Sequence, residues 1–249
     1  MPKFRVIPSV LTDGISQVKG SKFDNWRSVG SVMQAVKVHS IRDVDELLLL
    51  DVAAGQGGGF ISPKLVGLVA KTLQVPLAAG GGIRKLEHIE ALLTAGADKI
   101  VLGSACLLDG GFVSEASSMF GRQAIVCSID SRNSENSESC YQSGNSFKSI
   151  APQSLAVEME KAGAGELLLQ SVEHDGMRNG MNLPLLEAVV KSVRIPVIAG
   201  SGASSHEDFF RAASTGAAAV SAGAVFQFTE ITPDSVKDFL SRKGVDVRK

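Results

Sequence analysis

The chain has 249 residues, of which 44% are hydrophobic, so it is long enough to bury a large core and matches the length of one α/β barrel. Its net charge of −1 gives no basic footprint for nucleic acid, and no apolar run is long enough to span a membrane. The start of the chain lacks a signal-peptide pattern, and the three cysteines have no metal-site spacing. We therefore expect one cytoplasmic domain over residues 1–249, with no metal and no other cofactor.

Short apolar segments rich in Val, Ile and Leu alternate with segments of helical periodicity along the whole chain. In chain order, the predicted strands are Arg5–Leu11, Glu46–Val52, Val75–Ala79, Lys99–Gly103, Ala124–Asp130, Glu166–Ser171, Ile195–Ala199 and Ala218–Ala222. Such runs are typical of parallel strands buried on both faces. Helical segments such as Lys85–Ala95 and Ser154–Ala162 lie between them. Eight strands, each followed by a helix, predict a (β/α)8 TIM barrel, whereas a Rossmann sheet needs fewer strands and a switch point.

One stretch of low complexity interrupts this alternation. Residues 133–149 are rich in Ser and Asn and follow the fifth predicted strand. In a (β/α)8 barrel the segments after the strands lie on the catalytic face, so we predict a loop there.

The two halves of the chain resemble each other at an offset of 120 residues. Glu46–Leu49 returns as Glu166–Leu169, and the later matches are Pro76, Gly80, Gly82, Gly96 and Gly103 with Pro196, Gly200, Gly202, Gly216 and Gly223. A fixed-offset repeat of this kind predicts a barrel built from two duplicated half-barrels.

Glycine clusters follow the third, fourth, seventh and eighth predicted strands. They supply two candidate phosphate cradles, one formed by Gly81, Gly82, Gly103 and Ser104 and the other by Gly202, Gly223 and Ala224. Glycine lets backbone N–H groups approach an anion closely, and a following helix N-terminus adds a favourable dipole. The symmetry places the cradles on opposite sides of one mouth, suited to a small ligand with a phosphate at each end. Alternatively, these glycines only form tight turns. Because Ala224 lacks the hydroxyl of Ser104, we expect the second cradle to be the weaker one.

As a set, several segments resemble the cyclase subunit (HisF) of imidazole glycerol phosphate synthase. They are Arg5–Pro8, Val18–Gly20, Asp45–Leu47, Leu50–Asp51, Gly80–Arg84, Ala95–Lys99, Ser128–Asp130, Asp175–Gly176 and Phe226–Phe228. The resemblance spans nearly the whole chain. It implies a lyase of histidine biosynthesis that works with a HisH-like glutaminase, whose ammonia crosses the barrel interior to a phosphosugar site at the top.

The resemblance fails at one catalytic position. The family uses two aspartates as general acid and base, one ending the first strand and one ending the fifth. Asp130 matches the second, but Leu11 occupies the position of the first. Leucine transfers no proton, so ordinary ring closure looks compromised. Asp13 replaces the missing carboxylate only if the chain bulges, because neighbours on a strand point to opposite faces.

Other residues match the family's substrate site. Lys19 lies in the predicted loop after the first strand and matches a residue that closes over substrate; the alternative is a solvated lysine. Asp51 and Asp175 lie at or just beyond strand ends and should border the site. Their alternative role is helix capping or hydrogen bonding within loops.

Charged residues at the strand starts predict a second feature, at the bottom of the barrel. Arg5, Glu46, Lys99 and Glu166 should meet there and pair, because unpaired charges would be costly. In the family a matching ring is the gate through which ammonia enters, whereas the alternative is a structural plug. Asp98, beside this ring, matches a family residue that faces the glutaminase.

The apolar residues that follow Arg5–Pro8 resemble one branch of the family, associated with bacterial surface-sugar modification. Ala35–Val38 and Asp43–Leu47 share that resemblance. In this branch the barrel and a glutaminase supply ammonia to a separate enzyme that makes an acetamidino sugar. Two functions follow: a non-cyclising, ammonia-channelling amidotransferase subunit for surface polysaccharide, or a genuine cyclase that uses Asp130 with a substitute acid.

Overall fold

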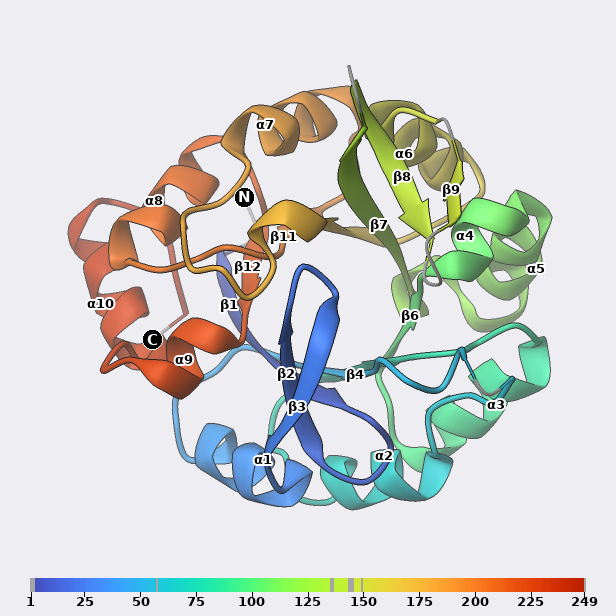
Figure 1. The fold of residues 1–249 in the computed structure, drawn as a ribbon, viewed down its shortest axis with the longest axis horizontal. Helices are drawn as coiled ribbons and strands as arrows, with labels where there is room; N and C mark the ends of the chain where they lie inside the picture. Colours follow the sequence, from blue (N-terminus) through green and yellow to red (C-terminus); the bar gives the residue numbers. More distant parts are fainter. Residues whose placement is uncertain (1–2, 57, 135–136, 143–145, 149, 249) are drawn as a thin grey trace.

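Parallel strands form a closed barrel in the computed structural model, which describes residues 3–56, 58–134, 137–142, 146–148 and 150–248 (Figure 1). Within these residues the eight barrel strands are β1 (Arg5–Thr12), β4 (Leu47–Asp51), β5 (Leu77–Gly80), β6 (Lys99–Leu102), β7 (Ile125–Ser134), β10 (Glu166–Ser171), β11 (Val197–Ala199) and β12 (Ala219–Ala222). Each strand pairs with its neighbours in parallel, and β10 pairs with β7 to close the circle. The predicted (β/α)8 barrel is confirmed, with strand ends shifted by at most four residues.

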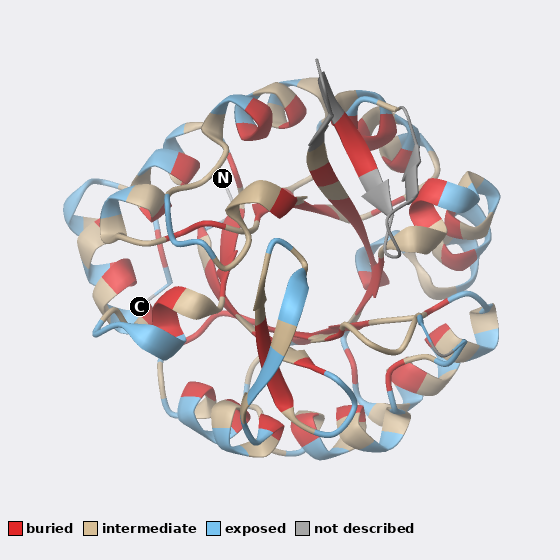
Figure 2. Cartoon of the chain, in the orientation of Figure 1, coloured by how far each residue is buried: buried red, intermediate tan, exposed pale blue. Residues whose placement is uncertain are grey.

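Helices surround the barrel and bury their apolar faces against the strands (Figure 2). They are α1 (Val32–Ser40), α2 (Pro63–Ala70), α3 (Leu86–Ala95), α5 (Gly110–Phe120), α6 (Pro152–Lys161), α7 (Leu183–Ser192), α8 (His206–Ser214) and α10 (Pro233–Arg242), with shorter turns α4 (Ser104–Leu108), η1 (Arg122–Ala124), η2 (Val172–His174) and α9 (Ala224–Phe228). Capping boxes begin α8 and α10. Within the described residues, none of the helices has the length and apolar character needed to cross a membrane.

The strands divide the core into an outer and an inner part, because successive side chains point to opposite faces. The outer part packs between strands and helices. The inner part fills the barrel with Ile7, Leu48, Ala78, Val101, Val126, Leu168, Ile198 and Ala219. The axis of the barrel is therefore apolar between its charged bottom and its polar mouth.

The predicted loop after the first strand instead contains an antiparallel hairpin over the barrel mouth (Figure 1). Its strands are β2 (Gln17–Ser21) and β3 (Asp24–Gly30). Lys22 and Phe23 join them with φ values of 54° and 59°, the conformation of a two-residue turn that matches the twist of a hairpin. Neither turn residue is the Gly or Asn that usually marks such a turn, and most of β3 is exposed, so the usual sequence signals are missing.

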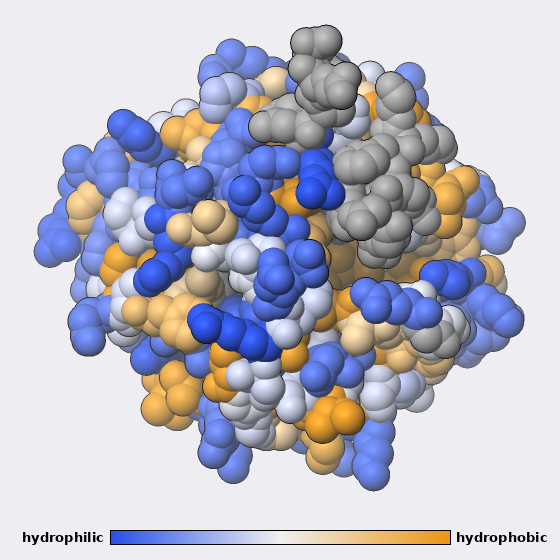
Figure 3. Space-filling model, viewed as in Figure 1, coloured by the Kyte–Doolittle hydropathy of each residue, from blue (hydrophilic) through white to orange (hydrophobic). Residues whose placement is uncertain are grey.

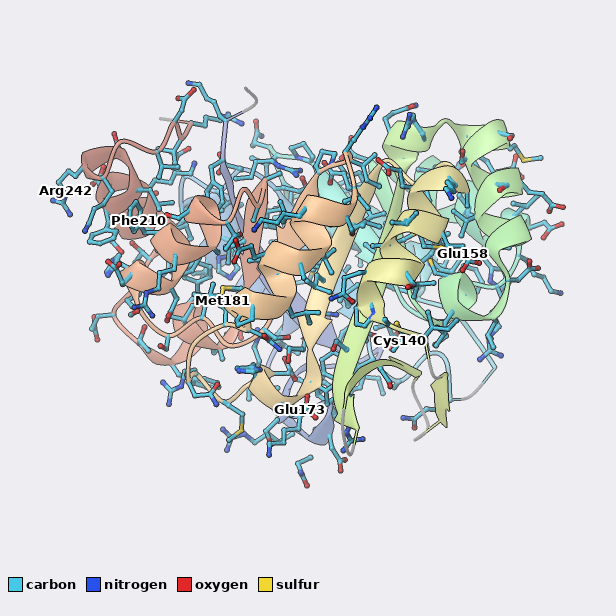
Figure 4. The ribbon with its side chains drawn as sticks, turned by 90° about the horizontal axis from the view of Figure 1, so that it is seen from above. Cys140, Glu158, Glu173, Met181, Phe210 and Arg242 are labelled. Carbon is cyan, nitrogen blue, oxygen red and sulfur yellow. The ribbon has the colours of Figure 1, made fainter. Side chains whose placement is uncertain are left out.

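The predicted loop over residues 133–149 is also wrong for the described residues. β7 continues to Ser134 and pairs with β8 (Ser137–Gln142), which pairs with β9 (Ser146–Lys148); residues 135–136, 143–145 and 149 lie outside the described residues. Cys140 of β8 is buried in the outer core (Figure 4). A buried contact of this kind favours strand pairing over the weak β-propensity of Ser and Asn.

Candidate active site at the barrel mouth

The β2–β3 hairpin crosses the mouth and docks on the segment that follows β10. The backbone N–H of Lys22 donates to the Asp175 carbonyl oxygen at 2.9 Å, and the N–H of Phe23 donates to Asp175 Oδ2 at 3.4 Å. Gly176 packs against the backbone of Gly20 so closely that a Cβ at Gly176 would collide with the Gly20 carbonyl oxygen. The hairpin thus separates two cavities among the described residues, and hydrophilic residues gather over this face (Figure 3).

The first cavity, here called the Lys19 cavity, has a volume of about 350 Å³ and contains the second predicted cradle of Gly202, Gly223 and Ala224. Lys19 lies on β2 rather than in a loop, and it is buried. Its Nζ donates to the Ser9 carbonyl oxygen at 3.3 Å and occupies the space that a Cβ on Gly223 would fill. Lys19 is therefore a buried cation at the cradle, and the alternative of a solvated lysine is excluded.

Arg27 and Arg178 also line the Lys19 cavity, and sequence reasoning missed both. The guanidinium of Arg27 lies 5.9 Å from the centroid of the Phe228 ring, a cation–π contact that orients it. Arg27 belongs to the hairpin that was not predicted, and Arg178 lies in the segment after β10 without a motif. The expectation that the second cradle binds anions more weakly rested only on the hydroxyl of Ser104, whereas Arg27 and Arg178 add positive charge to the second cradle. We now expect the second cradle to bind anions more tightly than the first.

The second cavity, here called the Asp130 cavity, has a volume of about 220 Å³ and contains the first predicted cradle. Its lining includes Asp51, Gly81, Gly82, Gly103, Ser104 and Asp130. Arg84 is the cation among the described residues that line it, and its Nη2 donates to the Gly55 carbonyl oxygen at 3.1 Å. The structure therefore places one predicted cradle in each cavity.

The cradle glycines differ in whether the local backbone requires a residue without a side chain. Gly82 and Gly202 have φ values of 67° and 90°, and a Cβ on either would collide with the carbonyl oxygen of Gly59 or Gly180. At these positions the predicted alternative of tight turns explains the glycine. Gly103 differs, because a Cβ there would meet only open space. The helices after Gly103 and Gly223 have five residues each, so the helix dipole contributes less than expected and side-chain charge matters more.

Asp130 lies at the mouth end of the barrel, hydrogen-bonded to two neutral groups. Its Oδ1 accepts from Ser128 Oγ at 2.9 Å and from Gln170 Nε2 at 3.2 Å. Burial raises the pKa of Asp130 to about 6, although the hydrogen bonds from Ser128 and Gln170 lower it. A carboxyl group with a pKa close to neutral is suited to general acid or base catalysis.

Leu11 lines both cavities and pairs in register with Leu50, so the position where the resemblance implies a first carboxylate presents an apolar side chain to the mouth. Asp13 does not substitute for it. Asp13 is exposed, and its Oδ1 accepts from the backbone N–H groups of Ile15 at 3.0 Å and Ser16 at 2.7 Å. These hydrogen bonds close a turn outside the cavities, and they lower the pKa of Asp13.

Asp175 is a second carboxylate with a shifted pKa at the mouth, and it lines both cavities. Burial raises the pKa of Asp175 to about 6, although the N–H of Phe23 and the charge of Lys19 lower it. Burial lowers the pKa of Lys19 to about 8, although Asp175 raises it. At pH 7 both groups are therefore mostly charged.

Asp51 borders the Asp130 cavity and also forms hydrogen bonds within the loop after β4, as the stated alternative allowed. Its Oδ1 accepts from the backbone N–H groups of Ala53 at 3.0 Å and Ala54 at 2.9 Å. Burial raises the pKa of Asp51, while these two hydrogen bonds lower it.

The pKa of Lys19 predicts how anion binding depends on pH. Sulfate remains a dianion across the neutral and alkaline range, so its affinity for the Lys19 cavity should fall as pH rises through about 8 and the ammonium loses its proton. Lys19→Arg should remove this dependence, and Lys19→Met should weaken binding by about tenfold. Calorimetric titration with sulfate measures both effects, with Lys22→Met on the same hairpin as the matched control. Sulfate affinity that is flat with pH in the unsubstituted protein would contradict the assignment.

At the opposite end of the barrel, Arg5, Glu46, Lys99 and Glu166 form the predicted closed ring. Arg5 lies 2.8 Å from Glu46 and 3.0 Å from Glu166, and Lys99 lies at the same distances from these two carboxylates. The Glu46 side chain is only 3% exposed, and its Oε1 has no hydrogen-bond partner. The ring closes the bottom of the apolar axis.

Asp98 lies beside this ring and is exposed. Its Oδ2 accepts a hydrogen bond from the backbone N–H of Leu77 at 2.9 Å, at the start of β5. Asp98 therefore has a local structural contact in addition to any contact with a partner.

Comparisons with known proteins identify the family to which the chain belongs. Residues 5–232 match the family model described as histidine biosynthesis protein. A Campylobacter jejuni protein provisionally named imidazole glycerol phosphate synthase subunit hisF2 is 40% identical over 100% of this chain and 99% of its own length. The imidazole glycerol phosphate synthase subunits HisF of Dictyoglomus thermophilum and Thermococcus onnurineus are 37% and 36% identical, over 98% and 93% of this chain and 98% and 92% of their own lengths. The chain therefore belongs to the histidine biosynthesis protein family, among the HisF-like subunits.

Proposed function

We propose that this chain is the barrel subunit of a two-component glutamine amidotransferase, and that it passes ammonia from a glutaminase along the barrel axis without closing an imidazole ring. The observation that carries the proposal is a contrast between the two ends of the barrel. The charged ring at the bottom is complete. At the mouth, Leu11 lines the Asp130 cavity, at the position where the resemblance to HisF implies one of two catalytic carboxylates.

The bottom of the barrel supports the conduit. Burying the charges of Arg5, Glu46 and Lys99 costs desolvation free energy, and an isolated barrel gains little in return. The interior above them is apolar, which suits neutral ammonia and excludes ammonium. A glutaminase docked on this face, with Asp98 in the contact, would release ammonia at the ring rather than into water.

The mouth supports a phosphorylated ligand. Lys19, Arg27 and Arg178 gather cationic charge around the second cradle, and the first cradle lies across the hairpin. Charge-assisted hydrogen bonds from such groups are the usual means of holding phosphate. Ammonia that reaches the mouth would then serve an amidating enzyme acting on a surface-polysaccharide sugar, in the cytoplasm, to form an acetamidino group.

The second candidate is a genuine cyclase of histidine biosynthesis, and one observation favours it. Asp175 and Asp130 line the same cavity, and each has a pKa of about 6. Asp175 is therefore a better substitute acid than Asp13. Its contacts with the hairpin tip, and the nearby charge of Lys19 that lowers its pKa, favour a structural role instead.

A cyclase assay with the ribulose-phosphate substrate and free ammonium separates the two candidates, because ammonium bypasses the glutaminase. We expect turnover to be about 10²–10⁴-fold below that of an authentic HisF assayed in parallel, the usual loss for one missing general acid or base. Turnover within about tenfold of the authentic enzyme would establish the cyclase instead.

A further inference from the structure

A third cavity lies outside the barrel, where α1, α9 and the base of the β2–β3 hairpin meet (Figure 1). It has a volume of about 270 Å³, near the lower end for small-molecule sites. The polar and aromatic residues in its wall include Gln17, Gln34, His39, Arg42, Phe226 and Gln227. None of its described lining residues is shared with the Lys19 cavity or the Asp130 cavity.

His39 is the first sign that this cavity receives a ligand. The residue is 7% exposed, and its Nδ1 has no hydrogen-bond partner. A buried polar atom in this state costs about 1–3 kcal/mol. A ring rotation that turned Nδ1 toward the cavity would let a bound ligand recover this cost. Burial, with the charges of Arg42 and Lys19, lowers the pKa of His39 to about 4, so the ring is neutral and offers one donor and one acceptor.

Arg42 is the second, independent sign. It lines the cavity and forms no ion pair with any residue that the structure describes. A guanidinium presents a planar fork of donors that matches a carboxylate or phosphate group.

The remaining wall has an apolar side and an amide side. The Phe226 ring packs edge-on against His39, with centroids 6.4 Å apart, and Val29 and Val38 complete the apolar side. Gln17 Nε2 donates to Gln227 Oε1 at 3.0 Å, which leaves the amide group of Gln227 with donors for another partner.

We propose that this cavity, bounded by Gln17, His39, Arg42 and Phe226, is a binding site for a small organic anion with a flat apolar body. The anionic group pairs with Arg42, a hydrogen-bonding group meets His39 or Gln227, and the body packs on Phe226. The site is distinct from the barrel mouth and does not rest on the amidotransferase assignment.

Two short chain segments join this site to the second cradle at the mouth, so a ligand bound here should affect anion binding there. Gln17 lies two residues before Lys19 on β2, and Gln227 lies on α9, which begins directly after Gly223. A ligand that fixes Gln17 and Gln227 therefore fixes both sides of the second cradle. Binding at the two sites is then coupled, and the coupling is reciprocal.

Benzoate is a suitable probe, because it combines a carboxylate with a flat apolar ring, and benzamide is its uncharged analogue. The methyl groups of Val29 and Val38 report binding by NMR, since both line only this cavity among those described. We expect saturable shifts with benzoate and about tenfold weaker binding of benzamide, the size of one lost charge-assisted hydrogen bond.

Substitutions locate the site. Arg42→Met should weaken benzoate binding by about tenfold, whereas Lys37→Met, an equal loss of charge on the exposed part of α1, should leave it unchanged. Gln34→Trp, at an exposed wall position, should block the cavity without disturbing the core. Benzoate should also change the sulfate affinity of the Lys19 cavity several-fold. Absent shifts, or shifts that survive both Arg42→Met and Gln34→Trp, would overturn the site, and an unchanged sulfate affinity would overturn the coupling.

Discussion

Leu11→Asp is expected to raise ammonium-dependent cyclase turnover by about 10²-fold or more over the unsubstituted chain. Leu11 lines the Asp130 cavity, and Asp130 already has a pKa of about 6. A second carboxylate at this wall would supply the group that the resemblance to HisF implies for acid–base catalysis. The new carboxyl group is partly buried beside Leu50, so we also expect a loss of unfolding free energy of about 1–3 kcal/mol.

Two controls isolate the chemistry in this experiment. Leu11→Asn has nearly the same shape but transfers no proton, so it should give no gain. Leu50→Asp places a carboxylate on the neighbouring strand, at the position paired in register with Leu11. It should also give no gain, because its position differs from the one that the mechanism uses. A folded Leu11→Asp protein that is no more active than Leu11→Asn would show that more than this carboxylate has been lost.

Lys99→Met is expected to cause the largest loss of stability, about 3–5 kcal/mol, because it leaves buried carboxylates with one cation instead of two. Lys99 Nζ lies 2.8 Å from Glu46 and 3.0 Å from Glu166, and the Glu46 side chain is 3% exposed. Denaturant unfolding measures the change. Lys99→Met should largely preserve glutaminase binding, since it alters the ring rather than the surrounding face.

Asp98→Asn, in contrast, should weaken glutaminase binding. It should disturb β5 less than Asp98→Ala would.

The exposed pair of Lys191 and Glu187 supplies the matched control. It is a lysine–glutamate pair at 2.6 Å, with side chains 71% and 51% exposed. Lys191→Met should change the unfolding free energy by less than about 1 kcal/mol. In the Leu11→Asp background, Lys99→Met should lower glutamine-driven turnover relative to ammonium-driven turnover, because ammonia escapes at the opened ring. Equal stability changes in Lys99→Met and Lys191→Met would contradict a buried, coupled ring.

The barrel could be predicted because its strands are buried on both faces and therefore are uniformly apolar. The bottom ring followed from the same rule, since Arg5, Glu46, Lys99 and Glu166 lie at or beside strand starts. The mouth was only partly predictable. Its aspartates and glycines follow strands, and the topology brings them together.

The missed features depend on contacts between distant segments. The hairpin turn at Lys22 and Phe23 has no local signal, and its tip is held by Asp175, far along the chain. Arg27 and Arg178 line one cavity only because this hairpin crosses the mouth. The outer cavity likewise joins Gln17 to Gln227, which no periodicity in the sequence connects.

The fate of the glutamine amide nitrogen tests the central claim most directly. The chain would be combined with a glutaminase encoded beside it, the ribulose-phosphate substrate and glutamine labelled with ¹⁵N in the amide, and the label followed by NMR. We predict that the chain binds the glutaminase and stimulates glutamine hydrolysis, and that the label is found in ammonium rather than in an imidazole ring. Label incorporated into imidazole glycerol phosphate at the rate of hydrolysis, or a glutaminase that the chain neither binds nor stimulates, would contradict a non-cyclising ammonia conduit.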